Sequence, residues 1–410
     1  MRRKSIGMVS LAAVVILLLM FSFSTEVYSS SEEPIKIGHV VPFTGDLSFI
    51  GQPFQNAAML AVEEINAAGG VLGREVVIIS EDSATDARGA VDALDKLINI
   101  DRVEVVAGGI SSMEASASIE KIRLNEILMI SPSATSATLT DANDDDFFFR
   151  TCPSDALQGA TLAMLAREKG YETASLLSRT DDYGLGLEDI FVKTFEELGG
   201  EVIRKVRYDP KTPDFSGYIT QVTERPADVI VVNALMEDGV RIFNRKQRMG
   251  VIEDFEFLVS EGVQDQGIPQ EVGFEAMAGI GGSTPYPVET GDFPQKYKDK
   301  YGEDPVAYCA NVYDNFILLA LAIQHAGKYE GPAVRDSLRE VANPPGEVVN
   351  DVTRALELVR EGKDISYQGA GGEIIFDENG DIRAERARTW IYNEEGQIEI
   401  TGEIEVDAGN

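Results

Sequence analysis

Two kinds of hydrophobic pattern alternate along the chain. Short apolar runs rich in β-branched residues predict strands, and longer segments whose apolar residues recur every three or four positions predict helices. The run at 229–232 has no polar alternation, which is typical of a strand covered on both faces of its sheet. Strands are predicted at residues 35–41, 75–80, 103–107, 127–130, 174–177, 201–206, 229–232 and 255–259.

Helical patterns lie between these strands. One covers residues 56–68 and ends at Gly69 and Gly70, as helices often do at glycine. The resulting β-α-β-α order predicts a parallel, doubly wound sheet, and this order occurs twice. Four predicted strands precede segment 147–151 and four follow it, so we interpret this segment as a crossover between two similar lobes.

The last third of the chain has a different pattern. After Gly279 a helical period returns over residues 308–326, and a strand meander follows. Segments 377–381 and 393–396 are rich in Asp, Asn and Gly and predict the turns of that meander. The whole pattern predicts an α/β fold of two sheet-based lobes.

The N-terminal segment has the features of an export signal. Residues 2–4 are basic, residues 11–21 are uninterrupted apolar, and a cut near Ser29 would remove residues 1–29. An uncleaved membrane anchor is the alternative, although the apolar run is shorter than a bilayer crossing requires. Either way, we expect the body of the protein in the periplasm or on the extracellular face of the cytoplasmic membrane.

Composition narrows the class of protein. The length of 410 residues predicts two or three domains, and 44% hydrophobic residues are typical of a globular protein. Lys and Arg number 36 against 69 Asp and Glu, a net charge of -33, which excludes a nucleic-acid partner. A saline habitat and a surface kept acidic for solubility both remain open as its source.

Histidine and cysteine are scarce, and this limits the possible chemistry. His39, His325, Cys152 and Cys309 have no spacing typical of a metal site or a disulfide framework, and whether the two cysteines pair is left open. We interpret both histidines as structural or solvated. The sequence also has no nucleophile elbow, phosphate-binding loop, dinucleotide fingerprint or zinc-protease motif. We therefore expect no catalytic residue, metal or cofactor; a secreted hydrolase is the enzyme alternative.

Polar residues follow several of the predicted strands. In open α/β sheets, ligands bind beyond the carboxyl ends of the strands. Segments 108–112 and 131–136 combine glycine, serine and threonine, which suit a carboxylate, whereas 181–184 and 260–262 place an acid directly after a strand, where it can hold an ammonium group. Helix capping and solvated loop carboxylates are the alternatives. Taken together, the four segments predict a site for a zwitterion such as an amino acid.

Three longer strings carry a family resemblance. The strings at 61–74 (AVEEINAAGGVLGR), 127–135 (ILMISPSAT) and 182–186 (DYGLG), with 42–45 (PFTG) upstream, resemble the branched-chain amino-acid-binding proteins of ABC importers. The resemblance covers essentially the whole mature chain. It implies the type I periplasmic-binding fold, with two doubly wound parallel-sheet lobes joined by a three-crossover hinge and a ligand enclosed between them.

The resemblance also implies a division of the chain and a set of site residues. Lobe 1 would comprise residues 34–150 and 282–372, and lobe 2 residues 151–281 and 373–406. The carboxylate-binding serine of the family falls on Ser112, its loop backbone contact on Ser133, its threonine on Thr135, its cleft tyrosine on Tyr183 and its ammonium-binding acid on Glu261, with Ala134 in the same loop.

The departures from the family concern the ligand's side chain. Ile50, Ala234 and Leu235 stand where relatives often have aromatic residues, so we expect a different side-chain pocket. Thr85 and Ser111 occupy the places of a disulfide found in some relatives. A branched-chain amino acid delivered to an ABC permease by a monomer is the leading hypothesis. Binding of urea or a short amide, or a sensory role, are the alternatives, and Glu261 favours an amino acid over urea.

Overall fold

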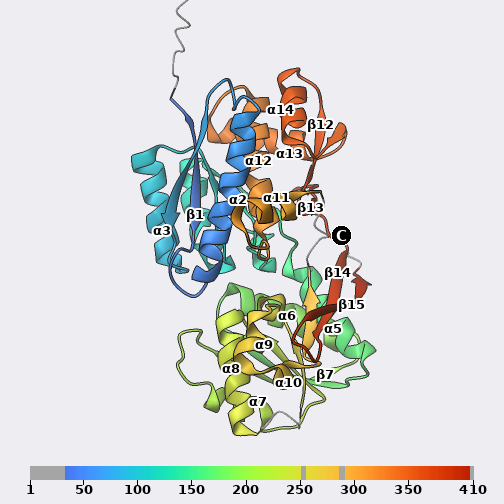
Figure 1. The fold of residues 1–410 in the computed structure, drawn as a ribbon. Helices are drawn as coiled ribbons and strands as arrows, with labels where there is room; N and C mark the ends of the chain where they lie inside the picture. Colours follow the sequence, from blue (N-terminus) through green and yellow to red (C-terminus); the bar gives the residue numbers. More distant parts are fainter. Residues whose placement is uncertain (1–32, 251–254, 286–290, 407–410) are drawn as a thin grey trace, which may run out of the picture. The chain divides into compact units, whose positions relative to one another are not determined.

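The computed structural model describes residues 33–250, 255–285 and 291–406, and the predicted leader lies outside these ranges. Two large sheets and a small one form the fold (Figure 1). In the described ranges, no helix is both long and apolar enough to cross a membrane.

The first sheet has five parallel strands in the order β2-β1-β3-β4-β5. They are β1 (Ile35–Val41), β2 (Val76–Asp82), β3 (Val105–Ala107), β4 (Leu128–Ser131) and β5 (Phe148–Arg150), joined through α2 (Ser48–Ala67), α3 (Ala87–Lys96), the π-helical turn Leu97–Asp101, α4 (Ser112–Asn125) and the 3-10 turn Ala137–Leu139. Strands β1, β3, β4 and β5 are almost entirely buried, whereas the edge strand β2 is mostly half-buried and ends in the polar residues Ser80, Glu81 and Asp82.

Strand β5 changes the interpretation of segment 147–151. Its residues pair in parallel with β4, so most of the segment belongs to the first sheet, and the chain leaves that sheet only at Thr151. Phe148, Phe149 and Arg150 are all buried there. A buried arginine in a strand is tolerated because its charge is compensated by Asp381.

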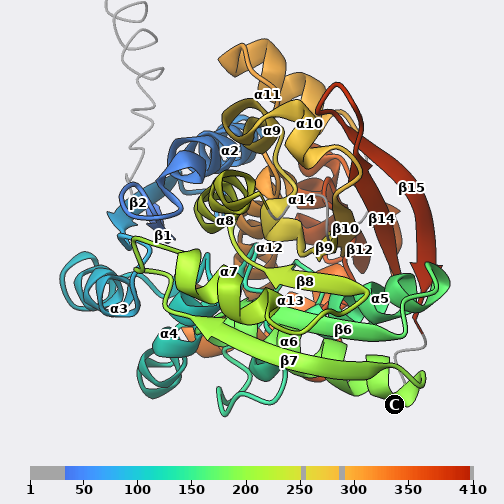
Figure 2. The ribbon, with the colours of Figure 1, turned by 90° about the horizontal axis from the view of Figure 1, so that it is seen from below.

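The second sheet has seven strands in the order β15-β14-β10-β9-β8-β6-β7, which can be followed across Figure 2. Five strands are parallel, and the C-terminal pair β14 and β15 forms an antiparallel hairpin at one edge. The strands are β6 (Thr173–Arg179), β7 (Glu201–Tyr208), β8 (Val229–Asn233), β9 (Glu256–Val259), β10 (Gly281–Thr284), β14 (Arg386–Tyr392) and β15 (Ile398–Glu405). The helices are α5 (Asp155–Glu168), α6 (Asp182–Glu197), α7 (Ser216–Thr223), α8 (Met236–Met249), α9 (Gly267–Val272) and α10 (Phe274–Met277), with the 3-10 turn Glu261–Val263.

Strand β10 was not predicted, because its sequence of two glycines, serine and threonine lacks a strand pattern. The glycines fit where side chains cannot: a Cβ on Gly282 would lie 1.7 Å from the Val259 oxygen, and one on Gly281 2.0 Å from the Trp390 oxygen. The predicted lobe boundary between residues 281 and 282 falls inside this strand, and the division into lobes stays a prediction.

The segment after β10 returns to the first sheet. Helix α12 (Cys309–Ala326) packs on α2, side by side in Figure 1, and every residue from Cys309 to Ile323 is buried. Because the helix is covered on all sides, its sequence is apolar without interruption from Phe316 to Ile323. Cys152 and Cys309 are both buried and form no disulfide. The same region contains α11 (Phe293–Tyr301), α13 (Gly331–Ala342), α14 (Val352–Arg360) and the small sheet of β11 (Glu347–Val349), β12 (Ile365–Gly369) and β13 (Gly372–Glu373).

The excess of acidic residues is solvent-exposed. Within the described ranges, the buried acidic side chains are few, namely Glu114, Asp155, Glu188, Asp238, Asp314 and Asp381, whereas the whole chain has 69 acidic residues. Like charges on a folded surface repel one another, and this repulsion opposes the compact state.

We therefore expect the melting temperature to rise as NaCl is increased from about 10 mM to about 1 M, since the screening length falls from roughly 30 Å to roughly 3 Å. Thermal unfolding followed by circular dichroism measures this. Sucrose at matched osmolality, which does not screen charge, is the control. A melting temperature that is independent of NaCl, or that rises equally with sucrose, would contradict the electrostatic explanation.

Candidate ligand-binding site

A cavity of about 120 Å³ is lined by loops that follow strands of both large sheets. The loops after β3 and β4 contribute Ser112, Ser133 and Thr135, and those after β6 and β9 contribute Tyr183 and Glu261. The structure thus brings together these five residues, which were predicted from strand ends and from the family resemblance. It does so because β3 and β4 are parallel in the first sheet and β6 and β9 are parallel in the second, so that the carboxyl ends of these strands meet at one edge of each sheet.

Four other positions were predicted to belong to the site, and the structure places two of them on the cavity wall. Ile50 and Leu235 line the cavity, whereas Ala234 is fully buried and does not. Ala134 is also fully buried, below the cavity surface, and its carbonyl accepts a hydrogen bond from Arg150. These two alanines therefore belong to the support of the site and not to its surface.

The N-terminus of α4 forms one part of the wall. Ser111 is its N-cap and forms a capping box with Glu114, so the capping explanation for the serines in this loop applies to Ser111. Ser112 has a different role: its Oγ accepts a hydrogen bond of 3.0 Å from the Ser136 N–H, which leaves its own hydroxyl proton for another acceptor. The first N–H groups of a helix also have no intrahelical partner, and they favour an anion.

The loop after β4 is held in shape by its own hydroxyl groups. Ser131 Oγ donates to the Gly109 oxygen at 2.7 Å and accepts from the Ala134 N–H at 2.9 Å. Ser133 Oγ donates to the Ile110 oxygen at 2.7 Å, which ties the loop to the preceding one. With its hydroxyl proton in use, Ser133 offers a ligand only acceptor oxygens and backbone.

Tyr183 and Glu261 form a hydrogen-bonded pair on the second sheet's side. Tyr183 OH donates to Glu261 Oε2 at 2.7 Å and accepts from the Gly262 N–H at 3.3 Å. Tyr183 lies in the first turn of α6, whose N-cap Asp181 is fixed by an ion pair of 2.6 Å with Arg179. The ion pair of Arg179 and Asp181 therefore holds in place the helix N-terminus on which Tyr183 lies.

Asp155 is a site residue that sequence reasoning missed. It is fully buried, its Oδ2 accepts from Thr135 Oγ1 at 2.9 Å, and its Oδ1 has no hydrogen-bond partner among the described residues. It begins α5 directly after the chain leaves the first sheet, where an acid is ordinarily explained as a favourable charge at a helix N-terminus. Only its burial and its bond to Thr135 distinguish it from such an acid.

The carboxyl groups of Asp155 and Glu261 are close enough to interact electrostatically, and among the described residues neither forms an ion pair. Burial raises the pKa of Asp155 well above its ordinary value, and the nearby Glu261 carboxyl raises it further. Burial also raises the pKa of Glu261, although the hydrogen bond from Tyr183 acts in the opposite direction. The guanidinium of Arg150 is near Asp155 but bonds to Asp381. Such a pair favours a bound cation, which would relieve the repulsion and the cost of burial.

The rest of the cavity is mainly apolar. Leu47, Ile50, Ile110, Leu235 and Met236 contribute aliphatic or thioether side chains to its wall. A ligand with a carboxylate for the α4 N-terminus, an ammonium group for the acids and an apolar remainder fits this distribution of groups.

Comparison with known proteins gives consistent results. Residues 34–357 match the family model described as periplasmic binding protein. The chain is 26% identical over 359 residues to the chemotactic signal transduction system substrate-binding protein BasB of Halobacterium salinarum, covering 83% of each chain. It is 25% identical over 361 residues to the leucine-, isoleucine-, valine-, threonine-, and alanine-binding protein of Pseudomonas aeruginosa, covering 87% of this chain and 89% of the relative. The crystal structure of a leucine binding protein LivK from Thermotoga maritima matches with a TM-score of 0.77 and 25% identity, over 91% of this chain and 99% of that one.

The family model matches most of the chain, and the chain therefore belongs to the periplasmic binding protein family. The fold implied by the resemblance, two lobes built on parallel sheets, is confirmed by the structure and by its likeness to LivK. Family membership implies a solute-binding protein that is exported from the cytoplasm.

We expect Asp155→Asn to change how stability depends on pH in the ligand-free protein. Because the pKa of Asp155 is raised in the folded state, its contribution to stability is present at acid pH and is lost as pH rises through that raised pKa. The variant lacks this loss and should be more stable than the wild type at about pH 8, with no difference at about pH 3, below the ordinary pKa of Asp.

Urea unfolding at a series of pH values measures this difference. Buried carboxyls that do not interact with Asp155, such as Asp314, whose pKa burial raises to about 7, are present in both proteins and cancel in the comparison. An Asp155→Asn variant that is less stable than the wild type at pH 8 would show that the ionised carboxylate stabilises the empty site.

Proposed function

We propose that the protein binds the zwitterion of an aliphatic amino acid, with leucine, isoleucine and valine as the leading candidates, and delivers it to an ABC permease. The observation that carries this proposal is a pair of carboxyl groups beside a cavity that also contains a helix N-terminus: Glu261 lines the cavity, and the fully buried Asp155 lies behind Thr135. Both accept hydrogen bonds, but neither forms an ion pair among the described residues. An ammonium group would supply the missing positive charge.

The proposed binding mode gives each residue a task. The ligand carboxylate is held by the hydroxyl of Ser112 and the N–H groups at the start of α4. The ammonium group donates to Glu261 and to Thr135 Oγ1, behind which Asp155 lies. Tyr183, already bonded to Glu261, orients that carboxylate. No bond is made or broken, and hinge closure of the two lobes encloses the ligand and creates the surface that a permease reads.

The apolar wall supports an aliphatic side chain. Ile50 and Leu235 replace the aromatic residues expected from the resemblance, and Met236 adds an adaptable thioether. Urea or a short amide would leave both acids without a positive charge, so the site disfavours these ligands. The P. aeruginosa and T. maritima relatives are both named as binding proteins for leucine, which supports this ligand class.

A sensory role is the second candidate function. The match to the H. salinarum protein, which is named for chemotactic signal transduction, favours it. The site and ligand would be the same, and only the partner would differ: a transducer in the membrane in place of a permease. Uptake of radiolabelled leucine and chemotaxis towards leucine, compared in cells with and without the protein, distinguish the two roles.

A thermal-shift panel tests the proposed ligand class. The protein lacking residues 1–29 is heated with each of the common amino acids, urea or acetamide. A ligand at about 1,000 times its dissociation constant stabilises the fold by roughly 4 kcal/mol, which raises the melting temperature clearly. We expect the aliphatic amino acids to give the largest shifts. A shift with urea or acetamide and none with any amino acid would contradict the proposal.

We expect Glu261→Gln to weaken L-leucine binding by about 2–5 kcal/mol, because the ammonium group would lose one partner of a buried charge pair. Titration calorimetry measures the dissociation constant. Glu271→Gln, which removes the same charge from an exposed position on α9, is the matched control and should bind like the wild type. Equal affinity of the two variants would remove Glu261 from the site.

A further inference from the structure

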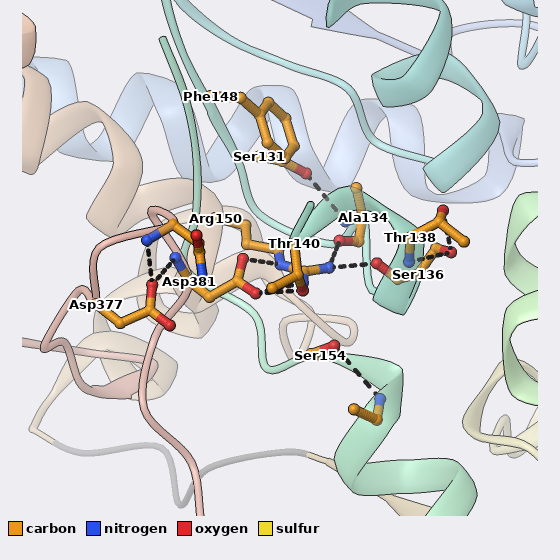
Figure 3. Close-up of polar contacts among 12 residues, drawn as sticks. Ser131, Ala134, Ser136, Thr138, Thr140, Phe148, Arg150, Ser154, Asp377 and Asp381 are labelled. Carbon is orange, nitrogen blue, oxygen red and sulfur yellow. Dashed lines mark hydrogen bonds and ion pairs between the residues drawn. The ribbon is translucent and has the colours of Figure 1, made fainter. Parts of the chain in front are cut away.

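A buried arginine makes hydrogen bonds to the loop that lines the cavity. Arg150, at the end of β5, has a fully buried side chain. Its Nη1 donates to the carbonyl oxygens of Ala134 and Ser136, at 3.0 and 2.8 Å (Figure 3). Ala134 and Ser136 therefore face the arginine through their carbonyls, whereas Ser133 and Thr135, which alternate with them, line the cavity.

The other side of the guanidinium is held by Asp381. Nε donates to Asp381 Oδ1 at 2.5 Å, and Nη2 to Asp381 Oδ2 at 2.6 Å, which is a bidentate pair. Thr140 completes the network, since its Oγ1 accepts from Nη2 at 2.8 Å and donates to Asp381 Oδ2 at 2.7 Å (Figure 3).

Asp381 belongs to a turn that is fixed to β5. Asp377 Oδ1 accepts from the Asp381 N–H at 3.0 Å, and the Gly380 oxygen accepts from the Arg150 N–H at 3.0 Å. Gly380 has a positive φ of 77°, and a Cβ there would lie 2.5 Å from the Phe148 oxygen, so no larger residue allows this approach. The turn lies between β13 and β14, where the chain passes to the second sheet, and Thr151 begins another such passage.

We propose that Arg150, oriented by Asp381, is a positioning residue for ligand binding: it fixes loop 131–136 in the orientation that presents Ser133 and Thr135 to the cavity. Its effect on affinity rests on the function proposed above. An ion pair that served stability alone would need Asp381 and no bonds to the loop. The planar guanidinium meets two carbonyls and a carboxylate at once, which the single ammonium of lysine cannot do.

The variants are chosen to separate positioning from stability. Arg150→Lys keeps the positive charge but removes the planar guanidinium that bonds to two carbonyls and a carboxylate. If Arg150→Lys does not fold, Asp381→Asn and Thr140→Val test the same proposal, because each weakens the hydrogen bonds that orient Arg150. Arg207→Gln is the matched control, because Arg207 donates to the buried Glu188 at 3.0 and 2.7 Å and contacts neither the loop nor the cavity.

Two measurements decide the proposal. Hydrogen exchange of the amides in residues 131–140, followed by mass spectrometry on the ligand-free protein, should be at least about tenfold faster in Arg150→Lys and unchanged in Arg207→Gln. The affinity for L-leucine, L-isoleucine or L-valine should fall at least about tenfold in Arg150→Lys but not in the control. In a double-mutant cycle, Arg150→Lys should cost less affinity when Thr135→Val is already present.

Failure of the proposed role of Arg150 can be distinguished from failure of the proposed amino-acid ligand. If the wild type binds none of the three amino acids, the ligand assignment fails, and hydrogen exchange alone decides whether Arg150 positions the loop. A folded Arg150→Lys variant with wild-type exchange in residues 131–140 would overturn the inference. So would affinity losses that are fully additive with Thr135→Val, because they would indicate a general structural effect.

Discussion

A charge buried in a protein is costly unless it is paired with an opposite charge and hydrogen-bonded. The site contains one set of charged groups that is paired within the protein and one that is not. Arg150 and Asp381 are paired with each other, since the guanidinium donates to both carboxylate oxygens. Asp155 and Glu261 have hydroxyl and amide donors but no ion-pair partner among the described residues. The ion pair of Arg150 and Asp381 holds loop 131–136 rigidly. The carboxyl groups of Asp155 and Glu261 lack a positive charge, which a ligand can supply. A binding protein needs both features: a loop held in one conformation and, next to it, charged groups that are stabilised only when the ligand is bound.

Most of the fold could be predicted from the sequence, because most of the buried parallel strands contain a run of apolar residues. The exceptions have physical reasons. Strand β10 was missed since its glycines are selected by the close approach of β9 and β14, which no local pattern reveals. Helix α2 begins at Ser48, eight residues before the predicted start at residue 56, because Ile50 and Phe54 are buried and continue the helix across Pro53.

The residues of the candidate site divide in the same way. Ser112, Thr135, Tyr183 and Glu261 follow strands, so a rule about strand ends locates them. Arg150, Asp155 and Asp381 could not be found in this manner, because their roles arise from pairing between distant segments. Arg150 and Asp381 are 231 positions apart in the sequence, and neither has a neighbour along the chain that indicates the other. The sequence therefore identifies the residues that line such a site better than the buried residues that hold the lining loops in place.

The long, fully buried helix α12 has a consequence for how the chain can be made. The hydrophobic core of the first sheet combines residues 35–149 with residues 293–382, and α12 lies among them. A ribosome that has completed the first sheet has therefore not yet produced the helix that covers it. The second sheet is synthesised in the interval, up to its final hairpin. Until α12 is made, helix α2 covers its part of this face on β1 and β2, but the apolar side chains of β3 and β4 lack the helix that packs on them. An incomplete chain therefore exposes apolar surface that the finished protein buries.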